Sequence, residues 1–111
     1  MRTAEIPAKD WSRTLDEFSA NHEGSLISVE LFGPALGAQS EIHDLPLLGL
    51  SIESAGDSTI TIAAGRSPEA HITHIIRAPT TVRIERTNDG ADVALAIESA
   101  EGITALLRLQ P

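Results

Sequence analysis

The chain contains four histidines, the side chains best suited to proton transfer or metal binding near neutral pH: His22, His43, His71 and His74. His71 and His74 are three positions apart, a spacing that would place both on one face of a helix. The segment Ala70–Arg77 is typical of a strand, however, because apolar and polar residues are interspersed without a helical period. In a strand an odd separation directs two side chains to opposite faces. We therefore expect the two imidazoles on different faces.

His74 is expected to share its strand face with Ile72 and Ile76. Both faces of this strand are partly apolar, which predicts a strand covered on two sides, with the helix as a candidate cover. The commonest situation for such a residue is a core histidine bonded to a backbone carbonyl or a carboxylate. An alternative is a pocket in which His74 anchors a ligand or acts as a general base. Metal binding by His74 together with His43 or His22 is less favoured, because nothing in the sequence brings them together.

The other signatures of catalysis are missing from the sequence. None of the paired or turn-adjacent acidic residues is embedded in an apolar strand face, the setting that raises the pKa of a catalytic acid. No serine lies in a G-x-S-x-G elbow, and Gly33–Gly37 lacks the spacing of a phosphate-binding loop. The sequence therefore predicts no catalytic residue, no metal site and no cofactor.

Several arginines fall on the predicted C-terminal part of the sheet: Arg77, Arg83, Arg86 and Arg108. A cluster of guanidinium groups can clasp a carboxylate or a phosphate. Glu85 and Glu98 are close in sequence, so exposed ion pairs between neighbouring strands are the simpler expectation.

The composition excludes several classes of function. With 8 Lys+Arg against 16 Asp+Glu in 111 residues, the formal net charge is −8, which disfavours nucleic acid and anionic membrane surfaces as partners. No apolar run approaches the roughly 18 residues of a membrane span, and Met1–Asp10 lacks the apolar segment of a secretory signal. The absence of cysteine fits a reducing compartment. We expect a cytoplasmic protein with a single domain over residues 1–111.

Two kinds of element must position these side chains. Trp11, Leu15 and Phe18 follow the spacing of one helical stripe, which predicts an amphipathic helix over residues 8–21 that ends near Gly24. From Ser25 onward the hydrophobic period changes to two, as in Ile27–Leu31 and Val93–Ile97. Short alternating runs separated by glycine-containing turns are typical of an antiparallel meander.

The turns support the same register. Asp89-Gly90 is predicted to form a two-residue hairpin turn, and Ala100-Glu101-Gly102 a three-residue turn with a bulge. Ser54-Ala55-Gly56 repeats the second pattern. The irregular segment 33–46 is expected to hold a short strand at Ala38–His43. We predict an α+β, mostly β fold: the helix packs on a curled antiparallel sheet or small barrel of about seven or eight strands, formed by residues 25–109.

Fragments along the whole chain carry a family resemblance. They are Glu5-Ile6-Pro7, Trp11, Leu15-Asp16-x-Phe18-Ser19, His22-Glu23-Gly24, Leu36-Gly37-Ala38-Gln39, Leu45-Pro46-Leu47, Thr73-His74-x-Ile76 with Pro79, and Gly102-x-Thr104-x-Leu106-Leu107-Arg108. Together they resemble a bacterial domain-of-unknown-function family, number 5335. The resemblance implies a stand-alone bacterial domain and supplies no activity, substrate or functional residue.

The sequence favours a small acidic binding or protein-interaction module without enzymatic activity. Recognition usually resides in loops on a rigid scaffold, so we expect the binding residues in segment 33–46, in the strand and loop of residues 71–79, and in the helix. They are His74, His71, Arg77, His43 and Trp11. The partner is expected to be a protein or a small ligand, and a homodimer is among the expected assemblies. The alternative is a small-ligand carrier or an enzyme with a pocket around His74.

Overall fold

The computed structural model describes residues 1–53 and 58–110 of the chain. A short 3-10 turn, Ala8–Asp10, precedes the helix α1, Trp11–His22. The strands are β1 (Arg2–Ile6), β2 (Leu26–Gly33), β3 (Gly37–Glu53), β4 (Thr59–Ser67), β5 (Ala70–Arg77), β6 (Pro79–Arg86), β7 (Asp92–Ser99) and β8 (Thr104–Leu109).

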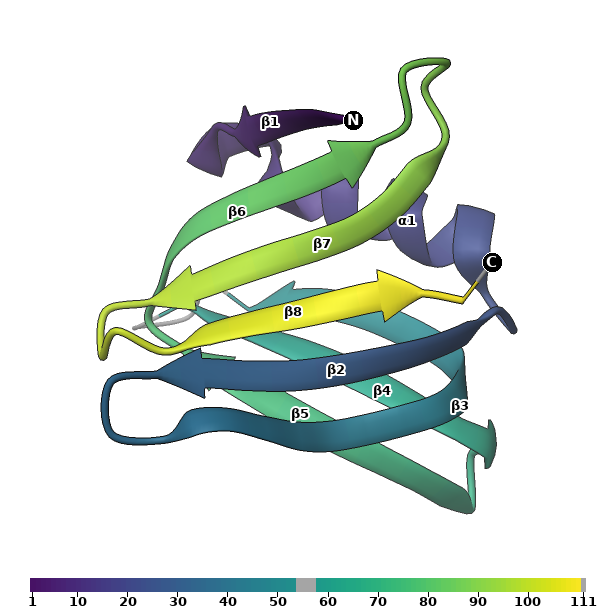
Figure 1. Ribbon diagram of the computed structural model, residues 1–111. Helices are drawn as coiled ribbons and strands as arrows, with labels where there is room; N and C mark the ends of the chain where they lie inside the picture. The colour runs from purple at the N-terminus through teal and green to yellow at the C-terminus, as the bar shows by residue number, and fades with distance from the viewer. Residues whose placement is uncertain (54–57, 111) are drawn as a thin grey trace.

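The eight strands of the described part form one antiparallel sheet that does not close. Its strand order is β1-β6-β7-β8-β2-β3-β4-β5, so that β1 and β5 are the two edges. Figure 1 shows how β1, β6, β7, β8 and β2 form one wall, while β4 and β5 turn behind it. The prediction of a mostly β fold with a curled sheet is confirmed, and of its two forms the open sheet is the one observed.

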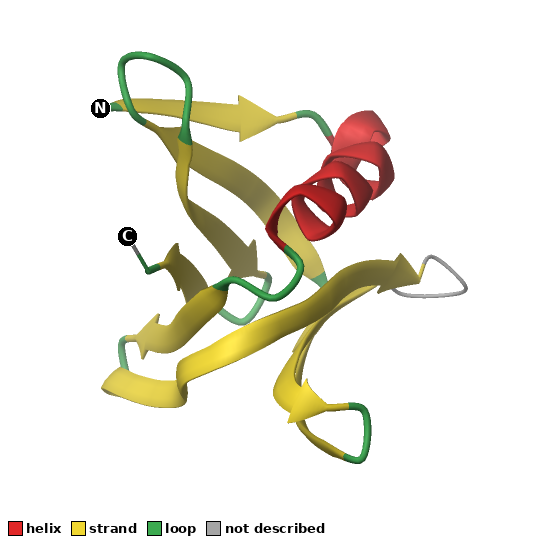
Figure 2. Cartoon of the chain, turned by 90° about the vertical axis from the view of Figure 1, so that its right-hand side faces the viewer, coloured by secondary structure: helices red, strands yellow, loops and turns green. Residues whose placement is uncertain are grey.

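Helix α1 fills the opening of the curled sheet. Its apolar stripe, Trp11, Leu15 and Phe18, is buried in the same core as the inward residues of the strands. Figure 2 shows the helix between the end of β1 and the second half of β3. The Ser19 hydroxyl fastens it there, because its oxygen accepts a hydrogen bond from the Leu50 N–H at 2.8 Å. The helix predicted over residues 8–21 is therefore confirmed, with its first turn in the tighter 3-10 form.

Strand β3 differs from the prediction, which placed a short strand at Ala38–His43 and another from Leu48. The structure has one strand of 17 residues that changes partners along its length. It pairs with β2 as far as Pro46 and with β4 from Leu47 onward. Pro46 has no N–H to donate, which is compatible with a strand at the point where one partner ends and another begins.

Strand β1 was not predicted, since we expected the sheet to begin at residue 25. Four of its five residues are exposed and only Ile6 is half-buried. The strand therefore carries no hydrophobic alternation for a sequence pattern to reveal. It is held by its backbone pairing with β6, from Arg2 opposite Arg86 to Ile6 opposite Val82.

The predicted two-residue turn at Asp89-Gly90 is wrong. The Gly90 N–H donates to the Thr87 carbonyl at 3.0 Å, and the Thr87 N–H donates to the Ala91 carbonyl at 2.8 Å. These bonds close a loop of three residues, with Gly90 at φ +94°. A register shift between Glu85 and Arg86 absorbs the additional residue. Ile84 consequently still lies opposite Leu95 on the buried face.

The three-residue turn at Ala100-Glu101-Gly102 is confirmed. The Gly102 N–H donates to the Ser99 carbonyl at 3.1 Å, and Ile97 and Leu95 lie opposite Ala105 and Leu107 as the register requires. The third predicted turn, Ser54-Ala55-Gly56, lies outside the described residues.

Gly102→Val is expected to destabilise the chain by about 1–3 kcal/mol, because Gly102 has φ +81° and a β-branched residue is strained there. A new Cβ at this position meets no heavy atom within 4 Å, so the cost comes from the backbone rather than from a clash. Urea unfolding measures it. Gly102→Asn is the control, since asparagine tolerates this conformation; equal losses for both variants would contradict the assignment.

Candidate functional site

His74 lies on β5, an edge of the sheet. The expectation that this strand is covered on both sides is wrong, because His71, Thr73, Ile75 and Arg77, which share one face, are all exposed, and helix α1 packs on β3 instead. Ile72 and Ile75, which project from opposite faces of the strand, are 45% and 47% exposed. Only Ile76 in this strand is buried. An edge strand of eight residues with exposed isoleucines offers unpaired backbone groups and apolar side chains together.

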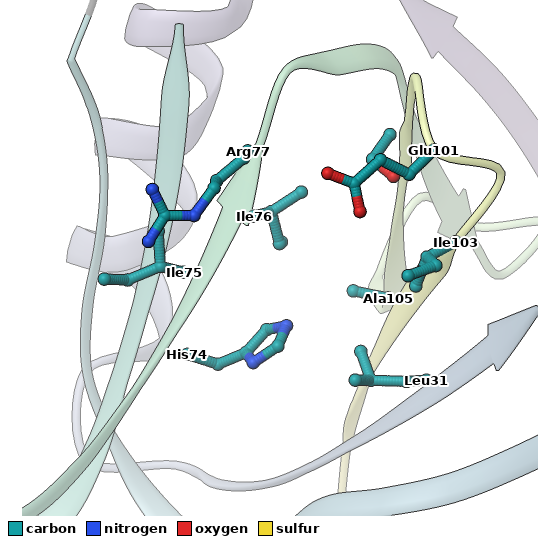
Figure 3. A pocket seen from close by; sticks show the side chains of 9 residues that line it. Leu31, His74, Ile75, Ile76, Arg77, Glu101, Ile103 and Ala105 are labelled. Carbon is teal, nitrogen blue, oxygen red and sulfur yellow. The ribbon is translucent and has the colours of Figure 1, made fainter. Parts of the chain in front are cut away.

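A pocket of about 200 Å³ opens between β5 and the β7–β8 end of the sheet. Figure 3 shows the His74 ring pointing into it, with Leu31 and Ala105 on the opposite side. The apolar lining is completed by Ile76 and Ile103. Because its walls come from β2, β5, β7 and β8, the pocket forms only where the curled sheet brings an edge strand over distant ones.

Polar groups surround this apolar pocket. Glu101, in the β7–β8 turn, extends toward it from one side (Figure 3). Arg77 and Ile75 also line the pocket, although they project from the opposite face of β5 to His74. The Ser99 hydroxyl oxygen is buried and has no hydrogen-bond partner within the described residues. The pocket can therefore offer an apolar surface, an imidazole and a hydroxyl to an incoming group.

Burial lowers the pKa of His74 below its usual value of 6.5, and the nearby Glu41 carboxylate opposes this shift to a smaller extent. The ring is therefore neutral at pH 7. A neutral imidazole at the wall of an apolar pocket can donate one hydrogen bond and accept another. His74 is therefore half-buried at a pocket and is not fully packed in the core, which was the first of the two situations that we predicted for it.

The stability of the chain is expected to fall as the pH is lowered through 6.5, because the unfolded state then binds a proton to His74 more readily than the folded state does. Urea midpoints at about pH 7.5 and 5.5 measure the loss. His74→Gln should reduce the loss. His43→Gln is the control, since the His43 side chain is 79% exposed, and it should retain the full loss; the same pH dependence in both variants would contradict the role of His74.

The other expected binding residues do not gather at this pocket, apart from Arg77. His71 is exposed, and its Nδ1 bonds to the Pro68 carbonyl in the β4–β5 turn. His43 lies on β3, with its Nε2 3.3 Å from an Asp44 carboxylate oxygen. Trp11 is in the core, where its Nε1–H donates to the Ile6 carbonyl at 2.9 Å.

A polar cluster that sequence reasoning missed joins the helix to the β6–β7 hairpin. The His22 Nε2 lies 2.8 Å from Asp92 Oδ2, and the Arg86 Nε donates to Asp92 Oδ1 at 3.0 Å. His22 also lies against Phe18, with 4.6 Å between ring centroids. Arg86 and Asp92 flank the Asp89-Gly90 turn, which could have suggested their pairing, but no local pattern connects either with His22. The cluster fastens the end of α1 to the sheet.

The remaining arginines behave largely as expected. Arg83 forms an ion pair with Glu98 across β6 and β7, and Arg108 approaches Glu30 to 3.5 Å across β8 and β2. These pairs are partly exposed and contribute little to stability. Within residues 1–53 and 58–110, no three potential ligands cluster as a metal site, and no helix is long and apolar enough to cross a bilayer.

The open antiparallel sheet, the helix in its opening and the pocket beside one edge define a small β-rich domain with a pocket at the sheet edge. The chain belongs to the family described as "Family of unknown function (DUF5335)", which it matches over residues 2–111. The family resemblance of the sequence fragments is thereby confirmed.

An uncharacterised protein of Aquifex aeolicus (strain VF5) is 29% identical over 111 residues, which are 100% of this chain and 95% of that protein. No solved structure matches the chain.

Proposed function

We propose that the chain is a protein-interaction module without enzymatic activity, and that it binds its partner along β5. The observation that carries this proposal is the combination of an edge strand, two isoleucines exposed at 45% and 47%, and an adjacent apolar pocket. Edge strands in natural proteins are usually protected by charges, proline or a covering element. Strand β5 carries a single charged residue, Arg77, and is left uncovered along most of its length.

The size of the pocket favours a side chain as its occupant. Pockets that enclose a drug-sized ligand have volumes of roughly 300–1,000 Å³, whereas this one holds about 200 Å³. When an extended segment adds to a sheet edge, backbone hydrogen bonds supply affinity and pockets for alternate side chains supply specificity. A strand added to β5 would direct every second side chain toward the face that carries His74 and Ile76.

The second candidate is a carrier or an enzyme for a small molecule bound at His74. It is favoured by one observation, the Ser99 hydroxyl that lines the same pocket as His74 and lacks a partner within the described residues. A ligand of this kind would need an apolar body and a polar group, and it would have to be smaller than most metabolites that proteins enclose.

Selection of extended peptides tests the first proposal. Panning a phage-displayed library of random peptides against the immobilised chain is expected to enrich binders, and a synthetic peptide from the selection should shift the NMR signals of β5 and of the residues around the pocket. Ile72→Lys should lower the affinity for this peptide at least tenfold, because the substitution places a charge on the apolar edge. The affinity can be measured by calorimetry.

Leu26→Lys is the matched control, because Leu26 is also 45% exposed but lies on β2. Its affinity for the peptide should be unchanged. A selection without enrichment, or equal losses in the two variants, would contradict binding along β5. If fragments of small molecules shift the His74 signals and His74→Gln abolishes those shifts while no peptide binds, the second candidate replaces the first.

A further inference from the structure

We propose that the partner of β5 is a second copy of this chain, paired edge to edge and antiparallel about a twofold axis at Thr73. The inference rests on the proposed function and names its partner. Thr73 is exposed and lies near the middle of the eight-residue strand. A symmetric dimer of this kind uses the same patch on both copies, so the patch must be complementary to itself.

The geometry of a sheet restricts the register. Residues directly opposite each other in an antiparallel pair project to the same face. If the two copies form one continuous sheet, each β5 residue must therefore lie opposite a residue of the second copy whose side chain projects to the same side of the sheet. An axis through a single residue satisfies this condition, because positions equally far on either side of that residue share a face.

Charge selects Thr73 among the central positions. An axis at Thr73 brings Arg77 beside Glu69 of the second copy, the turn residue that directly precedes β5, and symmetry repeats this pair at the other end. Both residues are exposed and neither forms an ion pair within the described residues of one chain. Moving the axis to His74 would place Arg77 opposite His71, and moving it to Ile72 would place Arg77 beyond the turn, at the level of Ser67, the last residue of β4. Neither alternative pairs opposite charges.

The same register completes the pocket. With the axis at Thr73, Ile72 of the second copy lies opposite His74, on the face from which the His74 ring enters the pocket. An isoleucine that is 45% exposed in one chain thereby covers the margin of an apolar pocket in the other. Each pocket is thus finished by a side chain of the second copy.

Local charge favours this edge as a contact in an acidic chain. The whole chain carries a formal charge of −8, so most surfaces of two copies repel each other. Residues 66–77 carry two arginines, Arg66 and Arg77, against one acidic residue, Glu69. The β4–β5 hairpin therefore contributes little to that repulsion.

Charge reversal tests the register. Sedimentation velocity over a concentration series is expected to show a reversible dimer. Arg77→Glu and Glu69→Arg should each weaken it by roughly tenfold or more, because either change puts like charges face to face at both ends of the interface. The double variant carrying both changes should dimerise like the unmodified chain, since the pair is restored with its charges exchanged.

Mixing the two single variants gives an independent result. One copy then carries acidic residues at both positions and the other carries arginine at both, so the mixture should form a heterodimer although each variant alone is mostly monomeric. Lys9→Glu is the control, because it changes the net charge as Arg77→Glu does but lies in the 3-10 turn before α1. It should leave the dimer unchanged, and circular dichroism should show all variants folded.

Two outcomes overturn the inference: a chain that stays monomeric at every concentration, and a dimer that neither reversal weakens. Both leave the proposed function to be judged separately. If the selected peptide still binds along β5 and Ile72→Lys still weakens it, the strand is an interaction surface for another protein. If peptide binding fails as well, the proposed function fails with it.

Discussion

Replacing Trp11 by alanine is expected to lower the free energy of unfolding by about 3–5 kcal/mol, the usual cost of removing a large aromatic side chain from a core. Trp11 is 8% exposed and is the first residue of α1. Its indole packs with Leu15 and Phe18 in the core that the sheet surrounds. The side chain also links α1 to β1, because its N–H donates to the Ile6 carbonyl.

Urea unfolding followed by far-UV circular dichroism measures this loss without relying on the fluorescence of the removed indole. Trp11→Phe keeps an aromatic ring but loses the hydrogen bond, so its cost should be clearly smaller. Ser12→Ala, at an exposed position of the same helical turn, should change stability by less than about 0.5 kcal/mol. A Trp11→Ala variant as stable as Ser12→Ala would show that the helix does not fill the sheet opening.

Gly65→Ala is expected to destabilise the chain by about 3 kcal/mol, the upper part of the range for overpacking. A Cβ at position 65 would lie 2.5 Å from the Ala70 carbonyl oxygen and 2.6 Å from the His71 Cα. These are backbone atoms of the paired strand, which cannot rotate away as a flexible side chain can. The two strands must separate to admit the methyl group, and β5 is held in the sheet only by β4.

Gly49→Ala is the matched control for this prediction. Gly49 lies in β3, and a Cβ there would meet no heavy atom within 4 Å. Alanine reduces the entropy of the unfolded chain, so this variant should be as stable as the unmodified protein or slightly more stable. Thermal unfolding of the two variants in parallel makes the comparison. Equal losses of stability in the two variants would mean that β4 and β5 leave room for a methyl group at position 65.

Most of the fold could be predicted because its signals are local. The stripe formed by Trp11, Leu15 and Phe18 reports a buried helix face within one segment, and strict alternation reports strands with one buried face. The turn at Gly102 could be predicted for the same reason, since its length and its glycine both agree with the register. These features depend on neighbouring residues alone.

The features that escaped prediction depend on pairing over long distances. Strand β1 has almost no buried side chain. It forms because its backbone pairs with β6, which lies about 80 residues further along the chain. The continuity of β3 depends on which strand lies beside each half, and Pro46 locally argues for a break. At the Asp89-Gly90 turn, the predicted two-residue loop assumed an unbroken register between β6 and β7, and the shift between Glu85 and Arg86 adds one residue to the loop.

The candidate site divides in the same way. The alternation of β5 indicated His74 and Ile76 on one face, and the structure places both at the pocket. That β5 is an edge could not be predicted, because strand order is not a property of any single strand. The pairing of His22 with Asp92 joins residues 70 positions apart, and the sequence around neither residue contains a pattern that indicates it.

The long strand β3 has a consequence for how the chain comes apart. Because β3 contributes one half to the β2 side and the other half to the β4 side, neither side can detach without loosening the same strand. Slow hydrogen exchange should therefore concentrate in the buried middle of β3, at Leu47 and Leu50, where exchange requires global opening. We therefore expect the two halves of the sheet to unfold together, because they share the backbone of β3.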